Sequence, residues 1–276
     1  MESMEKKTFY IAKARELRKQ IIEMIHAVGS GHPGGSLSAV EIIVSLYYNK
    51  LRINPRNPSW EDRDRFIASK GHCAPILYAA LADRGFFPKE ELLNLRKIGH
   101  FLQGHPDMKK VPGVDMSTGS LGMGLSVGNG MALAARLSVK NYYTYVLMGC
   151  GEQQEGQVWE AAMSSVKFKL DHLVAIVDYN QVQLDGKTND IMSLGDLSAK
   201  WLAFGWNVIE ADGHNVEDIC SAIELAHKVC GRPSIIIART TKGKGVSFME
   251  GKHEWHGKPI SDAECKQAIL EIGGVL

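Results

Sequence analysis

The chain has 276 residues, with 32 Lys and Arg side chains, 31 Asp and Glu side chains and a formal net charge of +1. This balance gives no bulk electrostatic reason to bind nucleic acid or a membrane surface. The length suits one domain with a large core. The amino-terminal sequence MESMEKK is charged and no apolar run approaches the length of a membrane span, so we expect a cytoplasmic protein.

The cysteine and glycine content narrows the class of protein further. Five cysteines, an odd number with no C-x-x-C pair, argue against a disulfide framework. Many of the 28 glycines gather in three segments, 29–35, 119–130 and 149–156. Such clusters are more typical of ligand-binding loops than of a flexible linker.

The first part of the chain shows helical periodicity. Apolar residues on one face predict a helix over about residues 8–28, ended by Gly29. The segment GSGHPGG that follows is a loop by composition. Ser38 and Glu41 have capping-box spacing, which predicts a second helix from about Ser38. Residues 65–68 indicate a short strand, followed by a helix through Ala82.

Strands and helices alternate along the rest of the chain. A glycine-rich segment leads into an alanine-rich helix that ends near Leu137, and close helix packing or cofactor approach would explain its glycines. The remaining predicted elements are strands at 145–148, 173–177, 206–210 and 234–238 and helices at about 157–169 and 216–230. This alternation predicts an α/β fold with a mostly parallel sheet flanked by helices.

Two predicted strand ends carry the clearest functional signal. Gly149 and Gly151 flank a turn directly after the strand at 145–148, where backbone N–H groups can approach an anion. The strand at 173–177 leads into the polar sequence Asp-Tyr-Asn that ends at Asn180. Because the carboxyl ends of parallel strands meet at one edge of a sheet, Asn180 should lie beside the glycine turn. This layout predicts a diphosphate cofactor.

The arrangement G-x-G-(x)3-E-G followed by Asn180 resembles the thiamine diphosphate motif of transketolases. Other motifs occur in transketolase order: GHPGG, KGH, GHPD, STGSLGMG, GKG and WHG. The resemblance covers nearly all of the chain. It implies a single diphosphate-binding domain over residues 1–276 and a transferase of carbohydrate metabolism, which moves a two-carbon ketol unit from a ketose or its phosphate to an aldose or its phosphate.

The resemblance also implies roles for particular residues. Thiamine diphosphate would supply the hard chemistry. Implied catalytic residues are His32, His72, His105 and His256, with Glu155 in a buried carboxylate relay that reaches a second active site. Implied cofactor-binding residues are Ser120, Leu121, Gly122, Gly149, Gly151, Glu152, Asn180 and Lys244. Ser120 stands where the family often has Pro. Lys242 and Lys244 are either surface charges or contacts to diphosphate or substrate.

Cys150 departs from the family pattern. The family has Asp at this position, and its carboxylate is a ligand of the Mg²⁺ ion that bridges protein and diphosphate. The other implied metal ligands are the Asn180 side-chain oxygen and the Val182 carbonyl. Mg²⁺, like Ca²⁺ or Mn²⁺, prefers oxygen ligands, and a thiol is a poor substitute. We therefore expect weakened metal binding.

The sequence has no counterpart of the family's pyrimidine-binding domain, which supplies a glutamate to the cofactor. We expect the N-terminal subunit of a split transketolase, completed by a partner C-terminal subunit in an α2β2 heterotetramer. One alternative is a cofactor-binding or regulatory subunit that has lost catalysis through Cys150. Another is a transketolase for an unusual ketose, branched or sulfonated. A 2-oxoacid dehydrogenase subunit or a deoxyxylulose phosphate synthase fits the WHG and GHP motifs less well.

Overall fold

Within residues 2–273, which the computed structural model describes, five strands form one parallel sheet in the order β1-β2-β3-β5-β4. Met1 and residues 274–276, which belong to the predicted domain range, lie outside the described residues. The strands are β1 (Arg65–Ala68), β2 (Thr144–Gly149), β3 (Leu173–Tyr179), β4 (Asn207–Asp212) and β5 (Ser234–Arg239). The predicted α/β class with a parallel sheet is confirmed.

Ten α-helices accompany the sheet in the described part of the chain. They are α1 (Glu2–Val28), α2 (Pro33–Ser38), α3 (Val40–Ser45), α4 (Ala74–Asp83), α5 (Met123–Leu137), α6 (Gly156–Lys167), α7 (Thr188–Met192), α8 (Leu197–Ala203), α9 (Val216–His227) and α10 (Asp262–Glu271). Two short 3₁₀ turns, η4 (Gly151–Gln154) and η5 (His253–His256), lie in loops that matter below. Among the described residues no helix is both long and apolar enough to cross a membrane.

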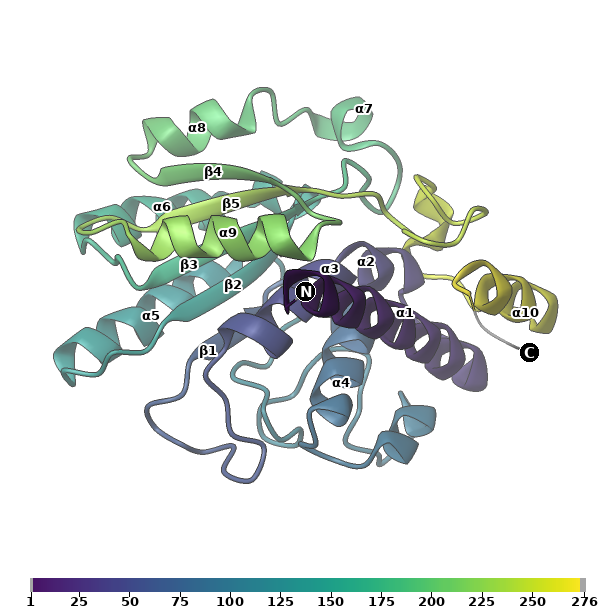
Figure 1. Ribbon diagram of the computed structural model, residues 1–276. Helices are drawn as coiled ribbons and strands as arrows, with labels where there is room; N and C mark the ends of the chain where they lie inside the picture. The colour runs from purple at the N-terminus through teal and green to yellow at the C-terminus, as the bar shows by residue number, and fades with distance from the viewer. Residues whose placement is uncertain (1, 274–276) are drawn as a thin grey trace.

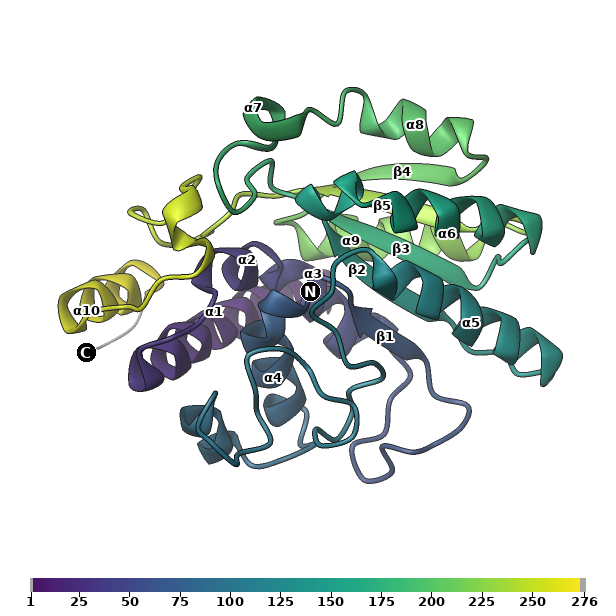
Figure 2. The ribbon, with the colours of Figure 1, turned by 180° about the vertical axis from the view of Figure 1, so that it is seen from behind.

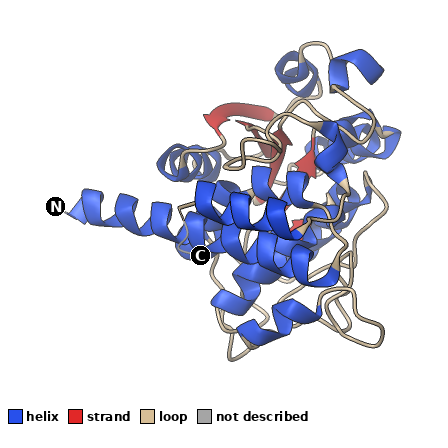
Figure 3. Cartoon of the chain, turned by 90° about the vertical axis from the view of Figure 1, so that its right-hand side faces the viewer, coloured by secondary structure: helices blue, strands red, loops and turns tan. Residues whose placement is uncertain are grey.

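The helices cover both faces of the sheet. In Figure 1 α9 lies in front of the strands, and in Figure 2 α5 and α6 lie in front while α9 is behind. The amino-terminal end of α1 projects beyond the rest of the molecule (Figure 3). Helices on both faces fit the apolar runs of β2, β3 and β5, which are almost entirely buried.

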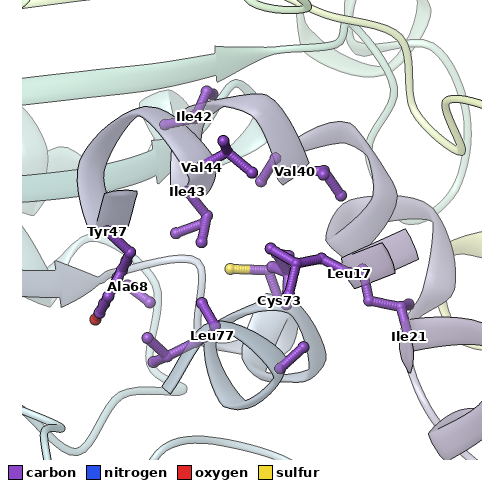
Figure 4. Packing of buried hydrophobic residues seen from close by; sticks show 14 of the residues in the cluster. Leu17, Ile21, Val40, Ile42, Ile43, Val44, Tyr47, Ala68, Cys73 and Leu77 are labelled. Atoms are coloured by element: carbon purple, nitrogen blue, oxygen red, sulfur yellow. The ribbon is translucent and has the colours of Figure 1, made fainter. Parts of the chain in front are cut away.

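Alternation along each strand divides the core into two clusters. On β2, Tyr145 and Leu147 pack with α1, α3, α4 and α9, whereas Val146 and Met148 pack with α5, α6 and α8. Figure 4 shows part of the first cluster, where side chains of α1, α3 and α4 meet around Cys73. The sheet is therefore a rigid support, and its loops are free to carry a site.

Two predictions for the region after Gly29 are wrong. The GSGHPGG segment is not loop throughout, because α2 begins at Pro33, and Pro is well suited to the first turn of a helix. Ser38 does not cap a helix either: it ends α2, and Ala39 precedes α3. The Ser38 hydroxyl donates instead to the carboxylate of Asp178 at 2.6 Å.

The ends of other helices and strands differ from the predicted ones by a few residues. β3 extends to Tyr179, so Asp178 and Tyr179 belong to the strand rather than to its polar tip. β4 runs two residues beyond its predicted end, because its pairing with β5 continues to Asp212 and Arg239. Two of the glycines of α5 are explained by packing: a Cβ on Gly124 would lie 2.3 Å from the Ser69 hydroxyl, and one on Gly128 would lie 2.6 Å from the Val146 Cγ2 atom. These contacts favour close helix packing over cofactor approach, the two explanations that the sequence left open for the glycines near α5.

Candidate functional site

Loops after four of the five strands enclose one cavity of about 240 Å³. Each loop brings a side chain to it within a few residues of its strand. These are Lys70 after β1, Cys150 after β2, Asn180 after β3 and Lys242 after β5. A larger cavity of about 400 Å³ lies between α1 and α9 and contains none of the predicted site residues.

Asn180 lies beside the glycine turn, where the sequence places it. Its neighbour Asp178 pairs in register with Gly149. The Cys150 Sγ atom lies 3.7 Å from the Asn180 Oδ1 atom, and the Val182 N–H donates to that same oxygen at 3.0 Å. The Asn180 Nδ2 atom donates to Asp178 at 3.1 Å, which fixes the amide so that its oxygen faces Cys150.

Asp178 is fully buried beneath the cavity and forms an ion pair with buried Lys70. It also accepts hydrogen bonds from the hydroxyls of Ser38 and Thr240. These donors hold the pKa of Asp178 below its ordinary value, although burial alone would raise it. A buried charge with these partners ties β3 to α2 and to the loops after β1 and β5.

Glu152 lines the cavity, but its side chain is buried. Its carboxylate accepts from the backbone N–H groups of Gly122 at 2.9 Å and Gly149 at 3.0 Å, and from the Ser69 hydroxyl. Burial raises its pKa. Since both carboxylate oxygens are engaged by the chain, Glu152 ties the loops together, and its contact with a cofactor stays a prediction.

The four predicted histidines lie together. His32 is at the centre, with ring centroids 5.8 Å from His72, 6.1 Å from His105 and 5.5 Å from His256, and the rings of His72 and His256 are 4.8 Å apart. Figures 1 and 2 show η5, which carries His256, beside α2. The structure thus brings together residues that are more than 200 positions apart in the sequence.

Close approaches explain why this segment needs its paired glycines. A Cβ on Gly34 would lie 2.8 Å from the Trp255 carbonyl oxygen, and one on Gly35 would lie 3.0 Å from the His72 ring. α2 can therefore pack against η5 and His72 only with glycine at both positions.

Two cations fix the protonation of two rings of the cluster, those of His32 and His256. Arg96 donates to the His32 Nδ1 atom at 3.0 Å, and the Lys242 ammonium lies 3.0 Å from the His256 Nδ1 atom. Because neither cation can accept a hydrogen bond, each ring must carry its proton on Nε2. Burial and these neighbouring cations lower the pKa of His32 to about 4 and that of His256 to about 3. At neutral pH both rings are neutral N–H donors.

Lys242 and Lys244 have different surroundings. Lys242 is buried, and its ammonium donates to the carbonyl oxygens of Val182 at 3.3 Å and Gln183 at 3.1 Å. Lys244, the expected cofactor contact, does not line the cavity; its ammonium lies 3.5 Å from Glu250 at the surface. The turn at Gly243, whose φ is +76°, separates the two side chains.

The remaining predicted residues lie at the rim. Leu121 lines the cavity and is 36% exposed, and Ser120 is exposed next to it. Gly122 has a φ of +83°, and a Cβ there would lie 2.8 Å from the Glu155 Cβ atom. Glu155 lines the cavity but is exposed in this chain, not buried. A relay through Glu155 would therefore require a second chain to cover it, and it stays a prediction.

The cavity fits a diphosphate. Lys242 is a buried cation with no carboxylate within ion-pair distance among residues 2–273, and a buried unpaired charge is costly unless an anion meets it. A Cβ on Gly149 would meet nothing closer than 3.9 Å, so its absence leaves room for a ligand near the backbone. Thiamine diphosphate presents two phosphates of the kind that this cavity can hold.

The metal donor set does not fit Mg²⁺. Only two of the three predicted donors are oxygens, on Asn180 and Val182, and the third is the Cys150 sulfur. The Val182 carbonyl already accepts a hydrogen bond from Lys242. Within the part of the chain that the structure describes, no three His, Cys, Asp or Glu side chains gather as a metal site.

Three features of the site were not predicted from the sequence. They are the role of Arg96, the role of Asp178 and the fact that Lys242, rather than Lys244, lines the cavity. Asp178 stood in the right motif, but its depth in β3 was not visible from composition. Arg96 lies 64 residues from His32, and no local pattern links them. Lys242 and Lys244 point in different directions because the backbone at Gly243 has a positive φ. The glycine permits this conformation, but its presence in the sequence does not show that the chain adopts it.

Comparison with known proteins gives a consistent result. Residues 11–274 match the family model described as "Transketolase, thiamine diphosphate binding domain". The chain is 47% identical over 260 residues to the 6-deoxy-6-sulfo-D-fructose transketolase subunit SqwG of Clostridium sp. (strain MSTE9), covering 94% of each chain. It is 44% identical over 256 residues to an apulose-4-phosphate transketolase subunit of Phocaeicola vulgatus, covering 92% of this chain and 90% of that one.

Longer relatives match over part of their length. Human transketolase is 43% identical over 260 residues, and the match covers 94% of this chain but 41% of the human protein. The crystal structure of the transketolase from Campylobacter jejuni superposes with a TM-score of 0.91 at 33% identity, covering 97% of this chain and 43% of that one. The chain thus spans less than half of these longer proteins.

Proposed function

Because this chain belongs to the family of transketolase thiamine diphosphate-binding domains, we propose that it is the N-terminal subunit of a split transketolase. Together with a partner C-terminal subunit, it transfers a two-carbon ketol unit from a ketose donor to an aldose acceptor. The observation that carries this proposal is the arrangement at the carboxyl edge of the sheet. There the four histidines adjoin a cavity whose one buried, unpaired cation, within the described residues, suits a diphosphate.

Bound thiamine diphosphate supplies the nucleophilic carbon and the electron sink that ketol transfer needs. This chain's residues then hold and orient the substrate. The neutral rings of His32 and His256 donate from Nε2 to substrate hydroxyls or to a developing alkoxide, because Arg96 and Lys242 occupy their Nδ1 atoms. We propose the same class of role for His72 and His105.

We propose that a divalent cation binds weakly at the diphosphate. The support is the sulfur of Cys150, which stands among oxygen donors at 3.7 Å from Asn180 Oδ1. Titrating cofactor affinity with Mg²⁺, Mn²⁺ and Ca²⁺ before and after Cys150→Asp measures this effect. We expect tighter Mg²⁺ binding by the variant; unchanged affinity would mean that Cys150 is not a defect.

We propose an α2β2 assembly that includes a partner C-terminal subunit. Two relatives that match over nearly their whole length are named as subunits. In this chain the rim residues Leu121 and Leu184 are exposed although they line the cavity, and a second chain would cover them. All five cysteines are free thiols, which suits the reducing cytoplasm that we propose as its location.

The substrate is proposed to be a ketose outside the common pentose and hexose phosphates. The names of two relatives refer to a sulfonated ketose and to apulose-4-phosphate. The chain itself offers the histidine cluster for hydroxyl groups, so discrimination between phosphate and sulfonate would fall to the partner.

The test is reconstitution. The gene next to the one for this chain is expressed with it, the pair is purified, and ketol transfer is measured with common, branched and sulfonated ketoses. We expect turnover by the pair, and His256→Asn should lower kcat about 100-fold or more through loss of one donor. Full turnover by this chain alone would show that no partner is required.

The same assay decides the alternative of a regulatory subunit. Cys150 favours that alternative, since it removes a metal ligand. A pair that binds thiamine diphosphate yet transfers no ketol unit, while Cys150→Asp restores transfer, would identify a subunit that has lost catalysis.

A further inference from the structure

Three lysines lie on or near the loops of the proposed cofactor site, and they differ in whether a carboxylate neutralises their charge. Buried Lys70 forms an ion pair with Asp178, and Lys244 is 39% exposed and lies 3.5 Å from Glu250. Lys242 is 2% exposed, and within residues 2–273 it has no carboxylate at ion-pair distance. Its three partners are neutral: two carbonyl oxygens and the His256 ring.

This ammonium group lies beside one of the expected metal ligands. It lies 3.3 Å from the Val182 carbonyl oxygen, one of the two oxygen donors predicted for a divalent ion. The residue that would add a carboxylate to that ion is Cys150. The chain therefore lacks one acidic group that a metal would use and holds an ammonium group beside another of the expected donors.

We propose that Lys242 supplies most of the positive charge that holds the diphosphate, so that cofactor binding by this chain depends only weakly on divalent cations. The inference rests on the proposed function, because it takes thiamine diphosphate as the ligand. It differs from the metal-bridged arrangement that the resemblance implies.

The geometry allows this exchange of partners. The Lys242 ammonium has three N–H donors on a flexible stem, and its present carbonyl acceptors are neutral. Phosphate oxygens are stronger acceptors for an ammonium group, since charge-assisted hydrogen bonds are roughly twice as strong as neutral ones. A bound diphosphate would therefore take N–H groups that the carbonyls of Val182 and Gln183 now hold.

Calorimetric titration of the purified pair with thiamine diphosphate tests the proposal. Titrations are run in EDTA and in Mg²⁺ for the wild type, Lys242→Met, Lys242→Arg and Cys150→Asp. Lys252→Met, an exposed lysine of the same loop, is the matched control. We expect the wild-type Kd to differ less than about 3-fold between EDTA and Mg²⁺, and Lys242→Met to weaken binding in EDTA about 10- to 100-fold. Lys242→Arg and the control should bind within about 3-fold of the wild type.

Cys150→Asp should restore metal dependence, with binding that improves about 10-fold or more when Mg²⁺ is added. Wild-type binding that disappears in EDTA and returns with Mg²⁺ would overturn the proposal and leave the proposed function intact. Absence of binding in every condition would overturn both. If Lys242→Met does not fold, the EDTA and Mg²⁺ titrations of the wild type and Cys150→Asp still decide the question.

Discussion

Asp178 is the residue on which the site's geometry depends most. It has no exposed surface, yet its carboxylate accepts from the side chains of Ser38, Lys70, Asn180 and Thr240. These donors come from α2 and from the loops after β1, β3 and β5. One buried charge thus sets the relative positions of segments that lie far apart in the sequence.

Asp178→Asn should destabilise the protein by about 3–5 kcal/mol, because it leaves the Lys70 ammonium buried without a carboxylate. The double variant Asp178→Asn/Lys70→Met should lose less than the sum of the single changes, since neither buried charge remains. Urea unfolding of the three variants measures this. Additive losses would show that the two side chains do not stabilise each other.

Histidine protonation should make stability depend on pH. The folded-state pKa of His32 is about 4, below the ordinary value of 6.5, so between these two values the unfolded chain binds a proton that the folded chain does not. The free energy of unfolding should therefore fall as pH is lowered from 6.5 to 4 and be independent of this group above 6.5. His32→Asn should flatten the slope in urea unfolding at several pH values. Equal slopes for the two proteins would contradict the assignment.

At the scale of elements, α5 packs on the sheet through glycine. A Cβ on Gly128 would lie 2.6 Å from the Val146 Cγ2 atom, whereas a Cβ on Gly130 would meet nothing within 4 Å. Gly128→Ala should therefore cost about 1–3 kcal/mol through overpacking. Gly130→Ala on the same helix should stabilise by about 0.5–1 kcal/mol through helix propensity.

Thermal and urea unfolding of these two alanine variants check the prediction. The pair is matched in element and in chemistry, so propensity cannot explain opposite signs. Similar stabilisation by both would show that α5 is not held close to β2.

Two of the S-x-x-E spacings in the sequence show where local reasoning fails. Ser261 and Glu264 form a reciprocal capping box at the start of α10. Ser38 and Glu41 have the same spacing but cap nothing, because Asp178 takes the Ser38 hydroxyl, and Arg18 and His214 take the Glu41 carboxylate. The pattern predicts a cap only when no distant charge competes for either side chain.

For the whole molecule, alternation of apolar strands and amphipathic helices was enough to predict the fold class. It also predicted that Asn180 lies beside Gly149, because parallel strands place their carboxyl ends together. What it could not predict were partners set by tertiary contacts, such as Arg96 behind His32. The histidine cluster was found only through the resemblance, since each histidine is locally ordinary in its loop.

Assembly should depend on the apolar rim of the cavity. Leu184 is 57% exposed and lines the cavity, and Leu225 is 52% exposed on α9, away from it. Leu184→Glu should weaken association with the partner chain by about 10-fold or more, because it places a charge in the covered surface. Leu225→Glu should leave association unchanged. Sedimentation of the mixed chains measures both, and equal effects would place the interface elsewhere.

All five strands are parallel, so their amino ends lie on one side of the sheet and their carboxyl ends on the other. This separation allows the chain to be labelled away from the cavity. Cys230 is exposed in the loop just before β5, on the side where the strands begin. The other cysteines are less accessible: Cys73, Cys150 and Cys220 are buried, and Cys265 is partly buried. A maleimide dye should therefore react first with Cys230, on the side opposite the cavity. Fluorescence from that dye would follow tumbling and subunit exchange without disturbing the ligand.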